Sequence, residues 1–109
     1  MKEILNQLSE TVNRRIESDE KYRKKLGKVT KTFCITFDGK ESYNFSLDNG
    51  KISEIQDGRK DSDIMVNVDS DTFRKILSKE IDPLSAYIEK KITVKASLLD
   101  KLLITELFK

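Results

Sequence analysis

Residues 64–103 read IMVNVDSDTFRKILSKEIDPLSAYIEKKITVKASLLDKLL, and this stretch decides how the fold is interpreted. Apolar residues alternate over 64–68, which predicts a strand with one buried face. The Asp and Ser side chains at 69–71 can cap the helix that follows them. Pro83 fits the first turn of a second helix, because the N–H that proline lacks is unpaired at that position in any helix. Apolar residues alternate again at 92–94, so the stretch predicts a strand, two helices and a further strand.

Tight turns separate the strands that we expect before this stretch. Three dipeptides there accept the positive φ of tight hairpins, Asp38-Gly39, Asn49-Gly50 and Asp57-Gly58. Apolar and small polar residues alternate over 33–37 and 43–47, which predicts two half-buried strands. The run 51–56 keeps this period poorly, because Ile52 and Ile55 would point to opposite faces, and a bulge or an edge position would explain it. We therefore expect a four-strand antiparallel meander, with a fifth strand after the proline helix.

Helical spacing of apolar residues marks both ends of the chain. Such residues recur every four positions from Ile4 to Ile16, which predicts an amphipathic first helix, and a short second helix should end at Gly27. The apolar residues between 98 and 108 form a stripe on a terminal helix that is wide enough to need a covering partner. The predicted fold class is therefore α+β: a five-stranded, mainly antiparallel sheet covered by helices, in a single domain over residues 1–109.

The composition argues against catalysis and metal binding. The chain has no histidine and one cysteine, so it can form neither a Ser-His-Asp nor a Cys-His nucleophile, nor a zinc site of the usual ligand count. The four glycines are taken up by turns and a helix end, which leaves no Gly-rich loop for a nucleotide. The carboxylates at 61–71 lack the glycine and the terminal glutamate of a calcium loop. We therefore expect no enzyme activity, no metal and no cofactor, since a paired-carboxylate enzyme would rest only on abundant Asp and Glu.

The sequence favours a cytoplasmic protein. Charged and apolar residues each make up 37% of the chain, which is typical of a globular domain with a charged surface. The longest aliphatic runs are three residues, far short of a membrane span, and residues 1–9 lack the continuous apolar segment of a secretory leader. Cys34 has no disulfide partner, which fits a reducing compartment, and we expect its thiol to be packed and unreactive.

Charge is distributed unevenly around a net value of +2. Residues 21–31 hold six bases and no acid, whereas residues 38–71 hold nine acids and four bases. A basic patch can contact phosphates or lipid headgroups, although a solvated helix face is the ordinary alternative. Because the isoelectric point of about 8.6 is low for a nucleic-acid binder, we expect no nucleic acid and instead transient contact with anionic membranes. The candidate headgroup contacts are Lys21, Arg23, Lys24, Lys25, Lys28, Lys90 and Lys91.

The stretch 64–103 resembles the sterol carrier protein type 2 (SCP-2-like) family. The similarity lies in an alternating strand, an Asp/Ser cap, a helix, and then a Pro with Ala three residues on, an aromatic and Lys-Ile, as in DPLSAYIEKKI at 82–92. Weaker agreement extends back to the first helices. Two departures concern glycines that the family uses at the edge of its pocket. Lys90 replaces the first and Ala96-Ser97 replace a Gly-Asp or Gly-Asn pair, so we expect a mouth of different shape.

The resemblance implies a tunnel between sheet and helices that binds a sterol, a fatty acid, an acyl-CoA or an isoprenoid-type molecule, without catalysis. The alternative is a protein-interaction or dimerisation module, an accessory part in lipid or quinone metabolism, whose terminal stripe pairs with a second copy or a larger enzyme. An empty apolar cavity is costly, so it should be filled by lipid, open to solvent, or shut by the terminal helix. The expected lining, whose ordinary alternative is core, is Phe73, Ile76, Leu77, Leu84, Tyr87 and Ile88, closed by Leu98, Leu99, Leu102 and Leu103.

Overall fold

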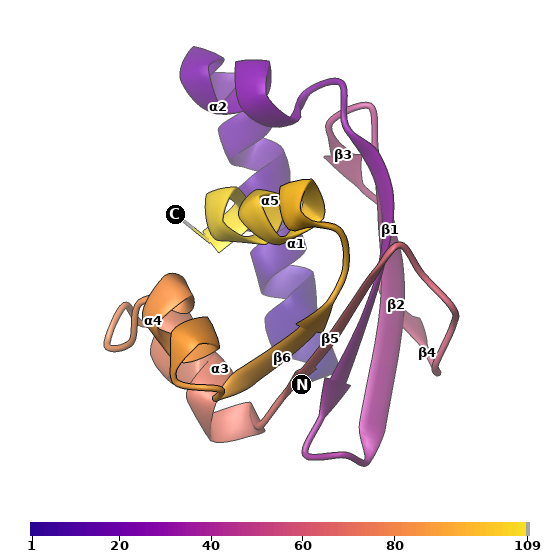
Figure 1. Cartoon of the computed structure of the whole chain (residues 1–109). Coiled ribbons are helices and arrows are strands. Elements are labelled where there is room, and N and C mark those ends of the chain that lie inside the picture. Colours follow the sequence, from indigo (N-terminus) through magenta and orange to yellow (C-terminus); the bar gives the residue numbers. More distant parts are fainter. Residues whose placement is uncertain (109) are drawn as a thin grey trace.

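The structure is a computed structural model that describes residues 1–108, and the side chains of residues 1–107. Figure 1 shows the helices on one side of the sheet, whose other face carries no helix of the described chain. In chain order the elements are α1 (Lys2–Ser18), α2 (Glu20–Leu26), β1 (Thr30–Phe37), β2 (Glu41–Asp48), β3 (Lys51–Ile52), β4 (Gln56–Asp57), β5 (Ile64–Val68), α3 (Ser70–Leu77), α4 (Pro83–Ile88), β6 (Ile92–Lys95) and α5 (Leu98–Phe108).

β1 lies at the centre of the sheet, whose strand order is β3-β2-β1-β5-β6, with β4 also paired to β2. β1 pairs antiparallel with β2 and parallel with β5, and β5 pairs antiparallel with β6. The predicted α+β class, with a mainly antiparallel sheet covered by helices, is confirmed. One connection differs from the expected four-strand meander, because β5 passes β2 and pairs with β1.

Matching apolar faces explain this crossover. In the parallel register, Phe33 lies beside Ile64 and Ile35 beside Val66, so the two alternating strands bring their apolar side chains to one face. β3 and β4, by contrast, have two residues each and offer few main-chain partners to a further strand. The longer β1 is therefore the better neighbour for β5.

The irregular third strand forms a bulged edge. β3 and β4 both pair with β2, but Leu47 faces Ile52 whereas Tyr43 faces Asp57, so the register slips by one residue between the two pairs. The extra residue allows Ile52 and Ile55 to turn to the same side, and both are buried. The predicted bulge at an edge position is confirmed.

Two of the three predicted turns, Asp38-Gly39 and Asn49-Gly50, join paired strands, and the predicted caps form at the expected residues. Asp57-Gly58 does not make the expected hairpin, because β4 pairs with β2 whereas β5 pairs with β1. Asp38 has a φ of 55°, the left-handed conformation of a tight hairpin turn. The Asp69 carboxylate accepts a hydrogen bond from the backbone N–H of Thr72 at 2.6 Å, and the Asp82 carboxylate accepts one from that of Ser85 at 3.0 Å. These bonds satisfy N–H groups that have no partner within the helix, so α3 and α4 begin where the sequence predicts.

Lys90 follows α4 in a left-handed conformation. Its φ is 62°, a value that a side chain with a Cβ adopts at a cost and that glycine adopts freely. The turn between α4 and β6 is therefore made here without the glycine that the family uses, and the shape of the mouth relative to the family stays a prediction.

The core lies between the helices and the inner face of the sheet. Phe33 and Phe45 stack with their ring centroids 5.0 Å apart, and Phe37 meets Phe73 of α3 edge-on at 5.1 Å. Cys34 alternates with these residues toward the opposite face and is fully buried. Its packing is thus confirmed, while its low reactivity stays a prediction. Within residues 1–108, no helix has the length and apolar character needed to cross a membrane.

Candidate functional site

α5 lies across the helical side of the sheet, between α2 and α4 (Figure 1). Ile104 and Leu107 point toward the sheet and are each 8% exposed, whereas Leu98, Leu99 and Leu102 are exposed to solvent. One hollow lies beneath this helix, one groove meets its C-terminal end at Leu107, and another groove runs along its side toward α4. α5 is therefore the roof of the candidate site, and it borders both grooves.

The inner cavity lies under α5 and is lined by apolar residues alone. Its volume is about 40 Å³, well below the roughly 300–1,000 Å³ of ligand pockets. Ile104 and Leu107 of α5 are among its lining residues, so the terminal helix narrows this space. Which of the three states expected for an apolar cavity applies stays a prediction. The lining residues are Leu8, Val12, Phe33, Ile35, Phe45, Ile52, Val66, Val68, Phe73, Ile76, Ile92, Ile104 and Leu107.

The first groove, which we call the α1 groove, lies between α1 and the end of α3, borders α5 at Leu107 and has a volume of about 260 Å³. Leu8, Val12 and Leu107 line both this groove and the inner cavity, so the two hollows are separated by side chains that they share. Arg15 and Lys79 also border the groove. A hollow with an apolar floor and cations at its edge suits an amphiphile with an anionic head.

The second groove runs between α4 and α5 and has a volume of about 190 Å³. Ile92 of β6 and Ile104 of α5 line both this groove and the inner cavity. The two grooves and the cavity thus form one apolar path under α5, interrupted by side chains. The residues of the second groove are Pro83, Leu84, Tyr87, Ile92, Val94, Leu98, Lys101, Leu102, Ile104 and Thr105.

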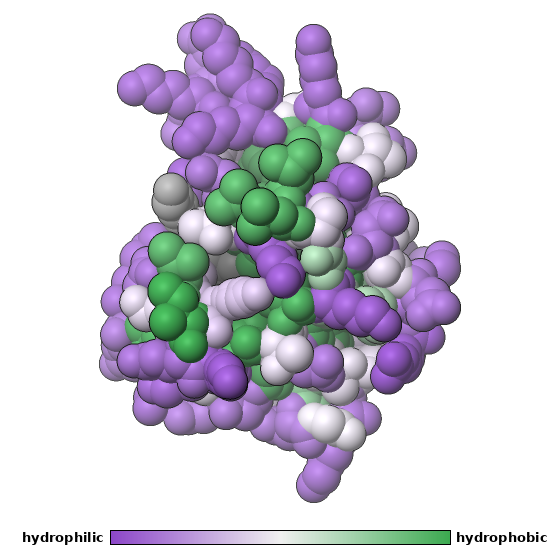
Figure 2. Space-filling model, viewed as in Figure 1, coloured by the Kyte–Doolittle hydropathy of each residue, from purple (hydrophilic) through white to green (hydrophobic). Residues whose placement is uncertain are grey.

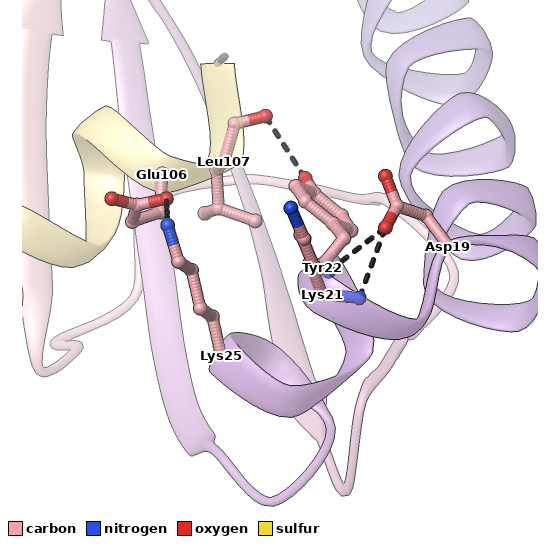
Figure 3. A network of polar contacts seen from close by, with 6 residues as sticks. All are labelled: Asp19, Lys21, Tyr22, Lys25, Glu106 and Leu107. Carbon is pink, nitrogen blue, oxygen red and sulfur yellow. Dashed lines mark hydrogen bonds and ion pairs between the residues drawn. The ribbon is translucent and has the colours of Figure 1, made fainter.

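Polar contacts fasten the C-terminal end of α5 to α2, as Figure 3 shows. The buried Tyr22 hydroxyl donates a hydrogen bond to the Leu107 carbonyl at 3.2 Å, and Lys25 Nζ lies 3.1 Å from Glu106 Oε2. Burial raises the pKa of the Tyr22 hydroxyl, and the nearby Glu106 raises it further while Arg15 opposes the change. The phenol therefore keeps its proton, and with it this hydrogen bond, at neutral pH.

The other end of α5 is held by two further lysine contacts. Lys31 of β1 lies 3.3 Å from Asp100, whose side chain is only 10% exposed. Lys101 Nζ donates to the Tyr87 hydroxyl of α4 at 2.9 Å. These contacts and those at Tyr22 are the rim contacts of α5. The Lys25–Glu106 pair is partly exposed and contributes up to about 1 kcal/mol. The Tyr22 hydrogen bond and the Asp100 carboxylate are buried, so their loss on opening must be offset by new contacts, such as those of a bound ligand.

The residues predicted to line a pocket are distributed over all three hollows. Phe73 and Ile76 line the inner cavity, and Leu77 lines the α1 groove. Ile88 and Leu99 have exposed fractions of 71% and 77% and are not among the residues that line the three hollows. Leu103 packs against the core and also lies outside their linings. The members that meet in the α4–α5 groove are Leu84, Tyr87, Leu98 and Leu102. Whether any of the ten contacts a ligand stays a prediction.

The cations predicted to meet lipid headgroups are all exposed and fall on two segments. Those on α2 and just after it are Lys21, Arg23, Lys24, Lys25 and Lys28, and those after α4 are Lys90 and Lys91. Three of them form ion pairs. The distance from the lysine Nζ to the glutamate carboxylate oxygen is 3.6 Å for Lys24 and Glu20, 3.1 Å for Lys25 and Glu106, and 3.4 Å for Lys91 and Glu89. Both segments flank α5 or the α4–α5 groove, and their headgroup contact stays a prediction.

The carboxylates at 61–71 serve local structure. Asp63 accepts hydrogen bonds from the backbone N–H of Thr32 at 3.0 Å and from its hydroxyl at 3.1 Å, and these bonds hold the pKa of the Asp63 carboxyl below its usual range. Asp71 pairs with Lys75 at 3.2 Å. In the part of the chain that the structure describes, no three His, Cys, Asp or Glu side chains gather as a metal ion would need.

The sequence analysis missed the contribution of α1 and the sheet to the site. Leu8 and Val12 line both the inner cavity and the first groove. Their four-residue spacing was the available signal, because it places them on the buried face of the first helix. Arg15 and Lys79 carry no such signal, since their placement depends on how α1 and α3 pack together.

The sequence pattern of the SCP-2 sterol transfer family matches residues 5–99. The chain belongs to this family. SCP-2 proteins form a lipid-transfer family, and the pattern covers the elements of this member except residues 2–4 of α1 and residues 100–108 of α5. No curated protein matches the chain in sequence.

Solved structures show the same fold at low sequence identity. A sterol carrier protein 2 crystal structure is 19% identical with a TM-score of 0.67, over 94% of this chain and 91% of that one. Palmitated SCP2L2 from Aedes aegypti is 17% identical with a TM-score of 0.68, over 93% of this chain and 90% of that one. The ubiquinone synthesis protein UbiJ-SCP2 is 12% identical with a TM-score of 0.67, over 96% of this chain and 92% of that one.

Proposed function

We propose that this SCP-2 member is a non-catalytic lipid carrier that holds an apolar molecule between its sheet and helices. The ligand is of the sterol, fatty acid, acyl-CoA or isoprenoid type. The observation that carries the proposal is the apolar path at α5, in which Leu107 joins the inner cavity to the α1 groove and Ile104 joins it to the α4–α5 groove. Membership of a lipid-transfer family supports it, as does the likeness in fold to a palmitated relative.

Ligand uptake requires α5 to move. A cavity of about 40 Å³ is too small for an acyl chain or a sterol, but displacement of Ile104 and Leu107 would merge it with the grooves. Each buried methylene contributes about 0.8 kcal/mol, so a chain of several methylenes can offset the rim contacts of α5. Because most of the affinity comes from the apolar tail, we expect broad specificity.

The chemistry of the chain fits carrying rather than converting a lipid. It contains no histidine and a single cysteine, Cys34, which is fully buried on the sheet. The lone free thiol is compatible with the reducing cytoplasm that we propose as its compartment. Arg15 and Lys79 at the α1 groove favour a ligand with a carboxylate or phosphate head.

A second candidate function is a protein-interaction or dimerisation module in lipid or quinone metabolism. The exposed Leu98, Leu99 and Leu102 on α5 favour it, as does the similarity in fold to a ubiquinone synthesis protein. Equilibrium sedimentation separates the two candidates. A stable dimer that binds no apolar molecule would favour the module, whereas a monomer that binds one would favour the carrier.

The carrier function is tested by changing the volume of the inner cavity. Ile104→Trp fills the cavity and should weaken binding of a fluorescent fatty acid about tenfold, because displacing two methylenes costs ~1.6 kcal/mol. Ile104→Ala enlarges it and should bind at least as tightly as the parent chain. Leu99→Trp, on the exposed side of the same helix, is the matched control and should bind within twofold of it. If the parent chain does not bind the probe, or if all three variants bind it equally, the carrier proposal fails.

A further inference from the structure

The exposed large apolar side chains of this protein are concentrated on two neighbouring helices. Within the described residues they are Leu84 and Ile88 on α4, and Leu98, Leu99 and Leu102 on α5, with exposed fractions from 52% to 77%. Figure 2 shows hydrophobic side chains gathered over α4 and α5 on this side of the molecule. We call these five residues the apolar face. The two groups are separated by more polar side chains (Figure 2). Exposed apolar side chains gathered on neighbouring helices in this way are typical of an interaction site.

Positive charge predominates in the segments that carry or adjoin the apolar face. Residues 20–31 and 83–107 include α2, α4 and nearly all of α5, and they contain ten Lys or Arg and four Asp or Glu. The rest of the chain contains eleven Lys or Arg and fifteen Asp or Glu. Each of the four acids is ion-paired with a base of the same two segments, Glu20 with Lys24, Glu89 with Lys91, Asp100 with Lys31 and Glu106 with Lys25. The two segments therefore carry a surplus of six positive charges, although the net charge of the chain is only +2.

We propose that the apolar face docks on a lipid bilayer that contains anionic phospholipids. The five side chains would enter the boundary between headgroups and acyl chains, while Lys21, Lys28 and Lys90 would contact the phosphates around them. This inference rests on the proposed carrier function, and it adds the surface at which the lipid is exchanged. The groove between α4 and α5 opens between the two parts of the apolar face, so docking would let a lipid move between groove and bilayer without crossing water.

The charge around the apolar face favours a bilayer over a second copy of the chain. In a symmetric dimer the same surface meets itself, so the surplus of positive charge on one subunit would face that on the other. An anionic bilayer accepts the apolar side chains and the lysines together. Each base near such a surface strengthens binding by about fivefold, and salt weakens this contribution.

Vesicle co-sedimentation tests the docking surface with the full chain. We expect it to bind vesicles of phosphatidylcholine and phosphatidylglycerol in equal parts, to release them at high salt, and to bind pure phosphatidylcholine far more weakly. Ile88→Ser with Leu99→Ser changes one exposed residue on each helix, outside the linings of the cavity and grooves, and should lower binding at least tenfold. Lys21→Gln with Lys28→Gln should lower it by about fivefold per lysine at low salt. The matched control is Lys40→Gln with Lys60→Gln, in the acidic part of the chain, which should change it less than twofold.

The same proteins are titrated with the fluorescent fatty acid without vesicles, so that failure of docking and failure of the carrier function can be told apart. Binding of the probe by a parent chain that does not bind anionic vesicles would overturn the docking surface and leave the carrier function standing. Binding of anionic vesicles without the probe would support the surface and overturn the carrier. If Ile88→Ser with Leu99→Ser converts a dimer into a monomer and vesicle binding is absent throughout, the apolar face is a subunit interface and the docking proposal fails.

Discussion

Tyr22→Phe should loosen α5 without disturbing the rest of the protein. The substitution removes the hydrogen bond from the Tyr22 hydroxyl to the Leu107 carbonyl, which is 3.2 Å long and joins two residues that are 4% and 8% exposed. The ring remains under the Arg15 guanidinium, which lies 3.9 Å from its centroid, and phenylalanine preserves that contact. A net loss of about 1 kcal/mol is expected for one neutral hydrogen bond. The equilibrium constant for opening of α5 should therefore rise about fivefold.

Hydrogen exchange and probe uptake measure this opening. The amides of α5 should exchange about fivefold faster in the Tyr22→Phe protein, and the association rate of the fluorescent fatty acid should rise by up to the same factor. Tyr43→Phe is the matched control, because the Tyr43 hydroxyl bonds to Glu41 of the same strand, at 3.1 Å and at the surface. The idea that α5 is the gate would be refuted if Tyr22→Phe changed neither rate, or if Tyr43→Phe changed both equally.

Two further predictions concern stability. Lys90→Gly should raise the free energy of unfolding, measured by urea titration, by about 1 kcal/mol, because glycine adopts the φ of 62° at this position without steric cost. Lys91 lies outside the left-handed region, so the control Lys91→Gly should not raise the free energy of unfolding. Hydrogen bonds from the Ser70 side chain and backbone lower the pKa of the Asp38 carboxyl, and bonds from Thr32 lower that of Asp63. These two carboxylates therefore stabilise the folded state fully above their unfolded pKa of about 3.9, and this stabilisation is lost as the pH falls through their lower pKa values in the folded state. Asp38→Asn with Asp63→Asn should flatten the loss of stability below about pH 4, and an unchanged slope would contradict this assignment.

Local rules in the sequence predicted most of the secondary structure. Asp69 and Asp82 cap helices where a cap was expected, and the bulge that reconciles Ile52 with Ile55 followed from a broken period. The parallel pairing of β1 with β5 was not predicted, because periodicity shows which face of a strand is buried but not which strand lies beside it. β3 and β4, which precede β5 in the chain, have two residues each, so they offer β5 fewer main-chain partners than β1 does.

The candidate site was predicted less completely than the fold. Phe73 and Ile76 could be found because they share a helix face, and they do line the inner cavity. The spacing of Leu8 and Val12 marks the buried face of α1, but no local pattern shows that this face meets the ends of α3 and α5, and Arg15 has no such spacing. The apolar stripe of the last helix was expected to need a covering partner, and Leu98, Leu99 and Leu102 are exposed in the single chain, so this expectation stays a prediction. An amphipathic pattern cannot show which of two apolar faces meets the core.

Native mass spectrometry of the freshly purified chain, followed by organic extraction, tests the carrier function most directly. We expect a species heavier than the 12.6 kDa chain, with a fatty acid, sterol or isoprenoid at near-stoichiometric amount, or else an empty chain that takes up one equivalent of the fluorescent fatty acid. An empty monomer that takes up none of it would contradict the account.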